Sequence, residues 1–203
     1  TLLAPVVQLQ FNTETGLYNV NITNPNEGVD GIQMEYHLGD DIWKLGFDYS
    51  KMADGELIIY FRFFLGTVTD GTVVGRDEVS EATKLTIENN ENNKVKGIIE
   101  DIDEQLNVTL NPSNIFTVEG TIPVIEEEID GIANENQKNF LTNKLNSLKT
   151  KVNTYKTSNG KAIIEAMINN LSTTSTLSKA TIDDILTRID GITSALYRKD
   201  LLQ

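Results

Sequence analysis

Cysteine is absent from this 203-residue chain, and histidine occurs only once, as His37. A chain without cysteine has no disulfide framework, no thiolate zinc site, no iron–sulfur cluster and no cysteine nucleophile. One histidine leaves a Ser-His-Asp arrangement arithmetically possible, but no nucleophile-elbow motif accompanies it. His37 follows Tyr36 in a strand-like segment, so we interpret it as a structural residue. We therefore expect no catalytic residues, no metal, no cofactor and no enzymatic activity.

Long hydrophobic runs and positive charge are also scarce. The most apolar run, residues 57–65, is interrupted by Arg62 and is far shorter than the ~18 residues of a membrane-spanning helix. Lys and Arg total 17 against 30 Asp and Glu, a net charge of −13, which argues against a nucleic-acid partner. The first eleven residues have neither the basic start nor the long apolar core of a secretory signal, so we expect synthesis without export.

The chain divides into two parts of different composition near residue 127. Residues 1–127 hold 22 acidic and 7 basic residues, whereas residues 128–203 hold 8 acidic and 10 basic ones. All four prolines and 11 of the 14 aromatic residues precede residue 128. This asymmetry predicts a β-rich front and a helical back, hence an α+β, multidomain protein.

Short alternating runs separated by turn residues fill the front part. We expect about seven short strands, which together favour an antiparallel β-sandwich over residues 1–90. Asp70-Gly71 and Gly75 mark one of the turns between them. The strand-like runs are residues 6–11, 17–23, 32–38, 42–47, 57–65 and 83–87.

Several motifs of this front resemble known modules. The opening Leu-Ala-Pro-Val-Val at residues 3–7 and the run Tyr-Asn-Val-Asn-Ile-Thr-Asn-Pro at residues 18–25 are similar to the start of fibronectin-III-like modules. The aromatic-Arg-aromatic run at residues 60–64 and the Ser80-Glu81 turn resemble late strands of the chitobiase C-terminal-type sandwich of bacteria and their phages. The resemblance covers residues 3–88. It implies a fold and no particular activity, because such sandwiches serve as spacers, adhesins and sugar binders.

Residues 91–127 are interpreted as a small β element that links the two parts, within which residues 95–110 form either a strand or a short helix over residues 98–106. The polar run Asn-Asn-Glu-Asn-Asn at residues 89–93 is typical of an interdomain linker or exposed loop. A hairpin turning at Pro112 and ending at Pro123 would follow it. The densest acidic clusters, residues 100–104 and 126–128, lack the calcium-loop pattern and are interpreted as solvated faces.

The back part, residues 128–203, carries two apolar repeats with heptad spacing. They predict a helical bundle or a stalk that pairs with other copies. A three-helix bundle within the chain and an oligomeric stalk both remain open, and a narrow seam favours the stalk. Asn159-Gly160 is expected to end the first helix. The candidate oligomer or docking seam consists of Leu141, Leu145, Leu148, Val152 and Tyr155, followed by Ile182, Ile185, Ile189, Ile192 and Leu196.

Aromatic residues of the front supply the one candidate ligand surface. An exposed platform for stacking on a sugar would consist of Tyr36, Trp43, Phe47 and Tyr49. Strand aromatics at such spacings more often belong to a sandwich core, so the two interpretations stand side by side.

Together these features predict a non-enzymatic structural protein with protein partners, either as a homo-oligomer or in a larger particle. A phage virion component, such as a head or tail fibre or a decoration protein, fits the joining of a displayed sandwich to heptad helices. The alternative is a bacterial cell-surface or extracellular module that binds a glycan or another protein.

Overall fold

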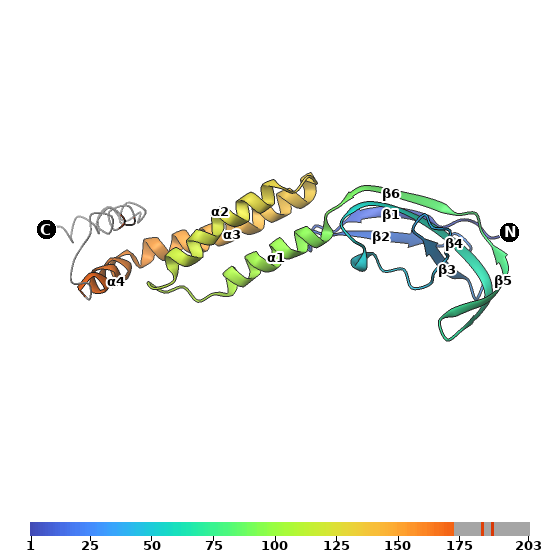
Figure 1. The fold of residues 1–203 in the computed structure, drawn as a ribbon, viewed down its shortest axis with the longest axis horizontal. Helices are drawn as coiled ribbons and strands as arrows, with labels where there is room; N and C mark the ends of the chain where they lie inside the picture. The colour runs from blue at the N-terminus through green and yellow to red at the C-terminus, as the bar shows by residue number, and fades with distance from the viewer. Residues whose placement is uncertain (173–183, 185–187, 189–203) are drawn as a thin grey trace. The chain divides into compact units, whose positions relative to one another are not determined.

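The computed structural model describes residues 1–172 together with Asp184 and Arg188. Within these residues it is a mixed α+β protein in which antiparallel sheets are followed by four helices (Figure 1). The α+β class is the one that the sequence predicts. The chain forms two compact units, Thr1–Gly97 with Asn134–Gln137 (the β unit) and Ile98–Ala133 with the chain from Lys138 onward (the helical unit). Within the described ranges, no helix combines the length and apolar character needed to cross a membrane.

Two antiparallel sheets make up most of the β unit. A hairpin forms the two-stranded sheet, and β4 is the centre of the four-stranded one. Phe64 of β4 pairs with Gln33 of β3 on one edge and with Val79 of β5 on the other, and β6 continues along the same edge as β5. The strands are β1 (Val6–Phe11), β2 (Tyr18–Thr23), β3 (Gln33–His37), β4 (Gly55–Thr69), β5 (Thr72–Val79) and β6 (Thr83–Asn90), with the short 3-10 helix η1 (Tyr49–Lys51) between β3 and β4.

The core of the β unit receives side chains from both sheets. Ile59 and Phe61 of β4 are fully buried, and Ile87 of β6 lies beside them. Val20 and Ile22 of β2 pack against this cluster from the smaller sheet. The alternation along each strand that predicted these segments therefore separates core-facing from outward-facing residues.

The strand predictions are confirmed for five of the six runs and wrong for one. Residues 42–47 form no strand, because Lys44 alone bridges to Tyr36 of β3. β5 was not predicted, because its exposed polar residues hide its alternation. The predicted turn is confirmed at Asp70 and Gly71, which both have positive φ, as a tight type I′ hairpin requires. Gly75, expected in the same turn, lies within β5.

The predicted β element at residues 91–127 is wrong, because this segment forms the helices α1 (Asn92–Asn107) and α2 (Ile115–Asp130). The alternative of a short helix over residues 98–106 is confirmed within α1. Pro123 lies inside α2, on its exposed side, instead of ending a hairpin. The helical signal was present as a buried repeat with spacing 3, 4, 3, 4. Its members are Ile115, Val118, Ile122, Ile125 and Ile129.

The helical unit continues with α3 (Glu135–Ser158) and α4 (Gly160–Ser172), so the predicted break at Asn159-Gly160 is confirmed. In α3, Leu141, Leu145, Leu148 and Val152 are buried, and Tyr155 is half-buried. The other predicted seam residues, Ile182, Ile185, Ile189, Ile192 and Leu196, lie outside the described residues.

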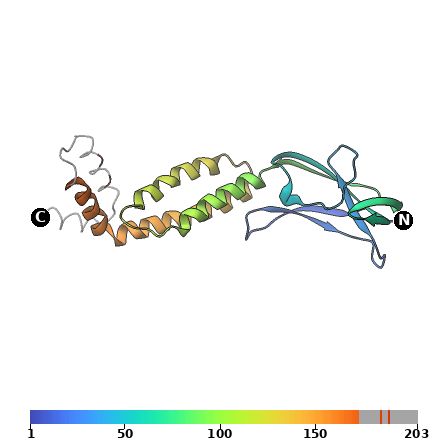
Figure 2. The ribbon, with the colours of Figure 1, turned by 60° about the horizontal axis from the view of Figure 1, so that its bottom comes forward.

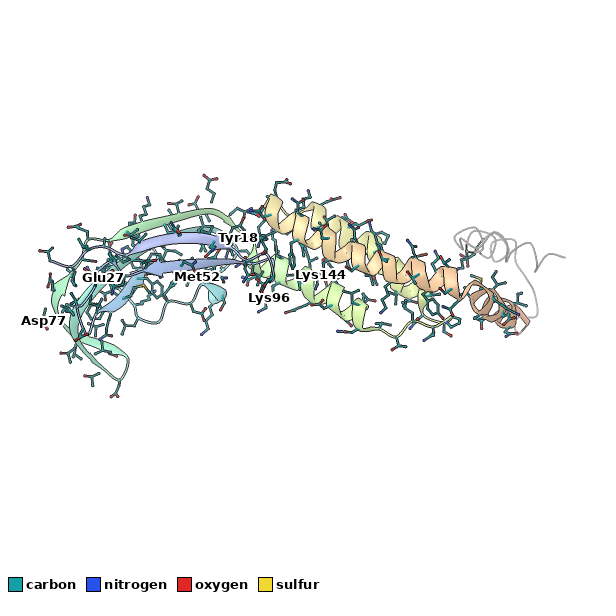
Figure 3. All side chains as sticks on the ribbon, turned by 180° about the vertical axis from the view of Figure 1, so that it is seen from behind. Tyr18, Glu27, Met52, Asp77, Lys96 and Lys144 are labelled. Carbon is teal, nitrogen blue, oxygen red and sulfur yellow. The ribbon has the colours of Figure 1, made fainter. Side chains whose placement is uncertain are left out.

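The directions of the first three helices can be followed in Figure 2, and polar contacts between them agree with these directions. Lys144 of α3, labelled in Figure 3, pairs with Asp103 of α1 at 2.6 Å. Further along α3, Lys151 donates to the carbonyl of Leu106 at the end of α1 at 2.7 Å, so α1 and α3 run parallel. Lys156 of α3 pairs with Glu119 near the start of α2, so α2 runs antiparallel to α3. Lys151 also satisfies carbonyls that a helix end leaves without partners.

Candidate functional site

The outward face of the four-stranded sheet holds a buried carboxylate between two arginines. Glu35 of β3 is 0% exposed. Arg76 of β5 donates hydrogen bonds to both carboxylate oxygens of Glu35, from Nε to Oε1 at 2.9 Å and from Nη2 to Oε2 at 2.6 Å. Arg62 of β4 donates from Nε to Oε1 at 2.7 Å. Sequence reasoning missed this triad, although alternation places Glu35 and Arg62 on the same face once β3 and β4 pair.

Aromatic rings extend the triad across the same face. The Arg62 guanidinium lies 3.8 Å from the centroid of the Trp43 ring, a close cation–π contact. His37 meets Trp43 edge-on at 4.4 Å and stacks on Tyr60 at 4.5 Å with nearly parallel rings. We call Glu35, Arg62, Arg76, Trp43, His37 and Tyr60 the outer-face cluster.

His37 is held by packing and by one backbone contact. Its Nδ1 accepts a hydrogen bond from the Gly39 amide at 3.0 Å, and its Nε2 lies 3.7 Å from Oδ1 of the exposed Asp41. Both ring contacts of His37, one edge-on and one stacked, are with aromatic side chains, and no described Ser or Thr hydroxyl hydrogen-bonds to it. This environment supports the structural interpretation of His37.

The charge state of Glu35 is set by opposing effects. Burial by itself raises the pKa of Glu35, but hydrogen bonds from Arg76 and Arg62 and their positive charges outweigh it, so its pKa lies below the ordinary value of 4.5. Glu35 is therefore ionised and engaged on both oxygens. A carboxylate held in this way is unsuited to proton transfer, because its proton affinity is low and its lone pairs are occupied.

The stability of the β unit is expected to depend on Glu35 below about pH 4.5. Because the folded-state pKa is lowered, the unfolded chain takes up a proton first, and stability is lost as pH falls towards the folded pKa. One such proton corresponds to a slope of at most about 1.4 kcal/mol per pH unit. Urea unfolding followed between pH 5 and 3 measures this slope, and Glu35→Gln should lose it; equal slopes in both proteins would contradict the prediction.

The predicted aromatic platform is not formed, so that interpretation is wrong. Tyr36, Phe47 and Tyr49 belong to the core cluster of the β unit, with Phe47 packing edge-on against the buried Phe61 ring at 4.8 Å. Trp43 lies apart from them in the outer-face cluster, where it is half-buried. Tyr36 and Trp43, on either side of the loop that follows β3, fall on opposite faces of the extended chain. The four predicted platform residues therefore do not share one surface.

A second polar cluster lies at the end of the β unit, where the sequence analysis predicted a linker. Asn92 binds the backbone of Tyr18, accepting from its N–H at 3.0 Å and donating to its carbonyl at 2.9 Å. Gln137, almost fully buried, donates to Asn92 Oδ1 at 3.0 Å and to the carbonyl of Gly16 at 3.2 Å. The Tyr18 hydroxyl, whose residue is labelled in Figure 3, donates to Asn134 at 3.1 Å.

Asn90 and Asn93 of the same run are also engaged. Asn90 is buried; it accepts from the Tyr49 hydroxyl at 2.9 Å and donates to the carbonyl of Ala53 at 2.8 Å. Burial raises the pKa of Tyr49 to about 12, so this hydroxyl stays a donor. Asp54 caps α1 by accepting from the amides of Asn93 and Lys94, both at 3.0 Å. The polar run at residues 89–93 is therefore hydrogen-bonded into the folded β unit, and its interpretation as a linker or exposed loop is wrong.

The described residues provide little for metal chemistry. No three His, Asp or Glu side chains of the described chain gather closely enough to hold a metal ion. Two of the acidic residues singled out in the sequence are committed to ion pairs, Asp103 with Lys144 and Glu126 with Lys149. Buried side-chain nitrogen and oxygen atoms in this part of the chain all have partners.

Comparison with known proteins adds no assignment: no protein-family model, curated protein or solved structure matches the chain. The resemblance to fibronectin-III-like and chitobiase C-terminal-type modules therefore stays a prediction.

Proposed function

We propose that this protein is a non-enzymatic structural protein that is built into a larger particle, of the kind found in phage virions as head or tail fibre or decoration proteins. The β unit would be a fibronectin-III-like sandwich that presents a surface. The helical unit would be a heptad-patterned bundle that contacts other polypeptide. One observation carries this proposal, namely the composition of the exposed face of α3.

Each exposed residue of α3 between residues 139 and 158 is Asn, Thr or Ser. We call this face the neutral stripe. By contrast, the exposed residues of α1 include Lys94, Lys96, Glu100, Asp101 and Glu104. The neutral stripe consists of Asn139, Thr142, Asn143, Asn146, Ser147, Thr150, Asn153, Thr154, Thr157 and Ser158.

Such a face is a poor choice for a helix that only meets water. Asn, Thr and Ser are weaker helix formers than Glu, Lys or Arg, and they forgo the ion pairs that stabilise exposed helices. Their absence of charge becomes an advantage on contact with another protein, because interface centres are depleted in Lys, Glu and Asp. Neutral amides and hydroxyls also cost less to bury than charges when they find hydrogen-bond partners.

The neutral stripe also replaces the surface that the sequence suggested for assembly. Leu141, Leu145, Leu148 and Val152 point away from solvent within the helical unit, so the α3 part of the predicted seam is internal packing. The stripe lies on the other side of the same helix. The non-enzymatic part of the proposal is supported by the outer-face cluster, whose carboxylate and histidine are held by their neighbours.

The stripe is tested by placing charges at its centre. Asn146→Glu with Thr150→Glu is expected to convert a multimer into a monomer, because two buried carboxylates without partners would oppose association. Light scattering at micromolar protein measures the mass, and circular dichroism checks the fold. Asn107→Glu with Thr109→Glu, also at exposed positions, is the matched control and should keep the multimeric mass.

Two outcomes contradict the proposal. The first is an unchanged mass for the stripe variant. The second is a monomeric wild type that binds glycans on an array and loses binding on Trp43→Ala, which favours the alternative of a bacterial surface or carbohydrate-binding module. The virion assignment is tested separately by the neighbouring genes, which should encode capsid and tail proteins.

A further inference from the structure

An open groove runs between α1 and α2 within the helical unit, with a volume of about 450 Å³. Phe116, Gly120, Val124 and Glu128 of α2 follow one another at intervals of four residues along it. At a rise of ~1.5 Å per residue, this side of the groove extends over roughly 18 Å, or more than three turns of helix. The groove is therefore long enough for about three turns of a helix to lie along it.

The side of α2 that borders the groove is built from residues that a helix normally avoids. Gly120 lies in the helix interior, and a Cβ built there meets no atom within 4 Å. Val124, one turn further along the groove, is 58% exposed. Gly and Val are both weaker helix formers than Ala or Leu, and both leave the groove side of α2 apolar and free of long side chains.

The charges around the groove identify the kind of partner. Asp101 and Glu104 of α1 and Glu128 of α2 border it, and each of the three is exposed. At one end, the Arg188 guanidinium already lies 4.7 Å from the centroid of the Phe116 ring, so this ring accepts a cation. An apolar floor with acidic edges complements a helix that carries aliphatic residues flanked by Lys or Arg.

We propose that the groove between α1 and α2 binds a cationic amphipathic helix of a partner protein. The apolar side chains of that helix lie over Gly120 and Val124, and its basic residues meet Asp101, Glu104 and Glu128. The surface lies on α1 and α2 and is separate from the neutral stripe of α3, so this inference does not depend on the proposed function.

The test uses the full chain and a synthetic helical peptide of about 18 residues, long enough to fill the groove, with Leu on one face and Lys at its flanks. Fluorescence anisotropy measures binding at about 0.15 M salt, where exposed charges are screened beyond ~8 Å. Gly120→Leu fills the groove and is expected to weaken binding by tenfold or more, about 1.4 kcal/mol. Gly120→Ala is the size control and should bind within about twofold of the wild type, because it adds one methyl group.

Two neighbouring glutamates supply a matched control for charge. Glu128 borders the groove and Glu127, also exposed, does not. Glu128→Lys is expected to weaken binding by about threefold or more, and Glu127→Lys to leave it within about twofold, as for exposed charges. Since neither substitution is at a buried position, this pair keeps the test informative if Gly120→Leu misfolds.

Several results would overturn the inference. Equal loss with Glu127→Lys and Glu128→Lys would show non-specific attraction to an acidic protein, and equal binding of a peptide with Glu in place of Lys would remove the charge argument. Unchanged binding to a folded Gly120→Leu would place the peptide elsewhere. A self-association that Gly120→Leu abolishes would make a second copy of this chain the occupant.

Discussion

Leu148→Asp is expected to unfold the helical unit. The side chain is fully buried in α3, and truncation of such a leucine alone costs about 2–5 kcal/mol. Asp removes the same contacts and adds a charge that has no partner there, so the total loss should be about 5 kcal/mol or more. Thermal unfolding followed by circular dichroism at the helical wavelength measures it. Ser147→Asp, one residue earlier on the exposed face, is the matched control and should leave the helix signal intact.

This experiment also decides what the leucines of α3 do. From spacing alone, charges at Leu145 and Leu148 would be expected to dissolve an oligomer. Their burial inside the described helical unit predicts loss of folding instead. A Leu148→Asp protein that keeps its helical content and shows only a smaller oligomer mass in solution would contradict the internal packing. The α3 leucines would then form an interface between chains.

Gly66→Ala is expected to destabilise the β unit by about 3 kcal/mol, the upper range for overpacking a tight site. Gly66 lies at an irregularity in the pairing of β4 with β5, and a Cβ there would be 2.0 Å from the carbonyl oxygen of Gly75. The obstacle is backbone of the paired strand, which cannot rotate away. Urea unfolding followed by the fluorescence of Trp43, the only tryptophan, measures the loss.

The partner glycine supplies the control for this prediction. A Cβ at Gly75 meets nothing within 4 Å, and its φ is not positive, so Gly75→Ala should change the free energy of unfolding by less than about 0.5 kcal/mol. If both substitutions had the same effect, loss of glycine flexibility would explain the result, and the close approach of the two strands would not.

Local pattern was a reliable guide where one face of an element is buried and the other meets water. Val20 and Ile22 alternate with polar residues in β2, and Leu141 and Leu145 recur at helical spacing in α3. The sequence therefore predicts both elements. The hairpin turn at Asp70-Gly71 was equally predictable, because the positive φ at both positions favours Asp, Asn and Gly.

The same reasoning failed where residue type and residue spacing disagreed. The buried face of α2 consists of Ile and Val, which favour strands, and Pro123 suggests a chain break. Their spacing of three and four nevertheless marks a helix, and burial against α3 outweighs weak intrinsic preferences. At residues 115–129 the periodicity therefore indicates the structure and the residue types do not.

The candidate sites depended on contacts between distant parts of the chain. Nothing in the order of residues joins Glu35 to Arg76, 41 positions away, or Tyr18 to Asn134, 116 positions away. The asparagines at residues 89–93 resembled a loop because their side chains are polar, and only their partners show that Asn90 and Asn92 are structural. The four aromatics of the predicted platform lie close together in the sequence, and they are separated because Tyr36, Phe47 and Tyr49 face the core cluster and Trp43 does not.

By itself, the sequence determined the α+β class, five of the six strands and the helix that ends before Asn159, because each depends on which neighbours along the chain share a face. Only the tertiary structure decided that the leucines of α3 are covered by the same chain, that Glu35 is caught between two arginines, and that α1 and α2 enclose a groove. These outcomes are set by which faces meet in space, and the energy of a buried group depends on the partner it finds there.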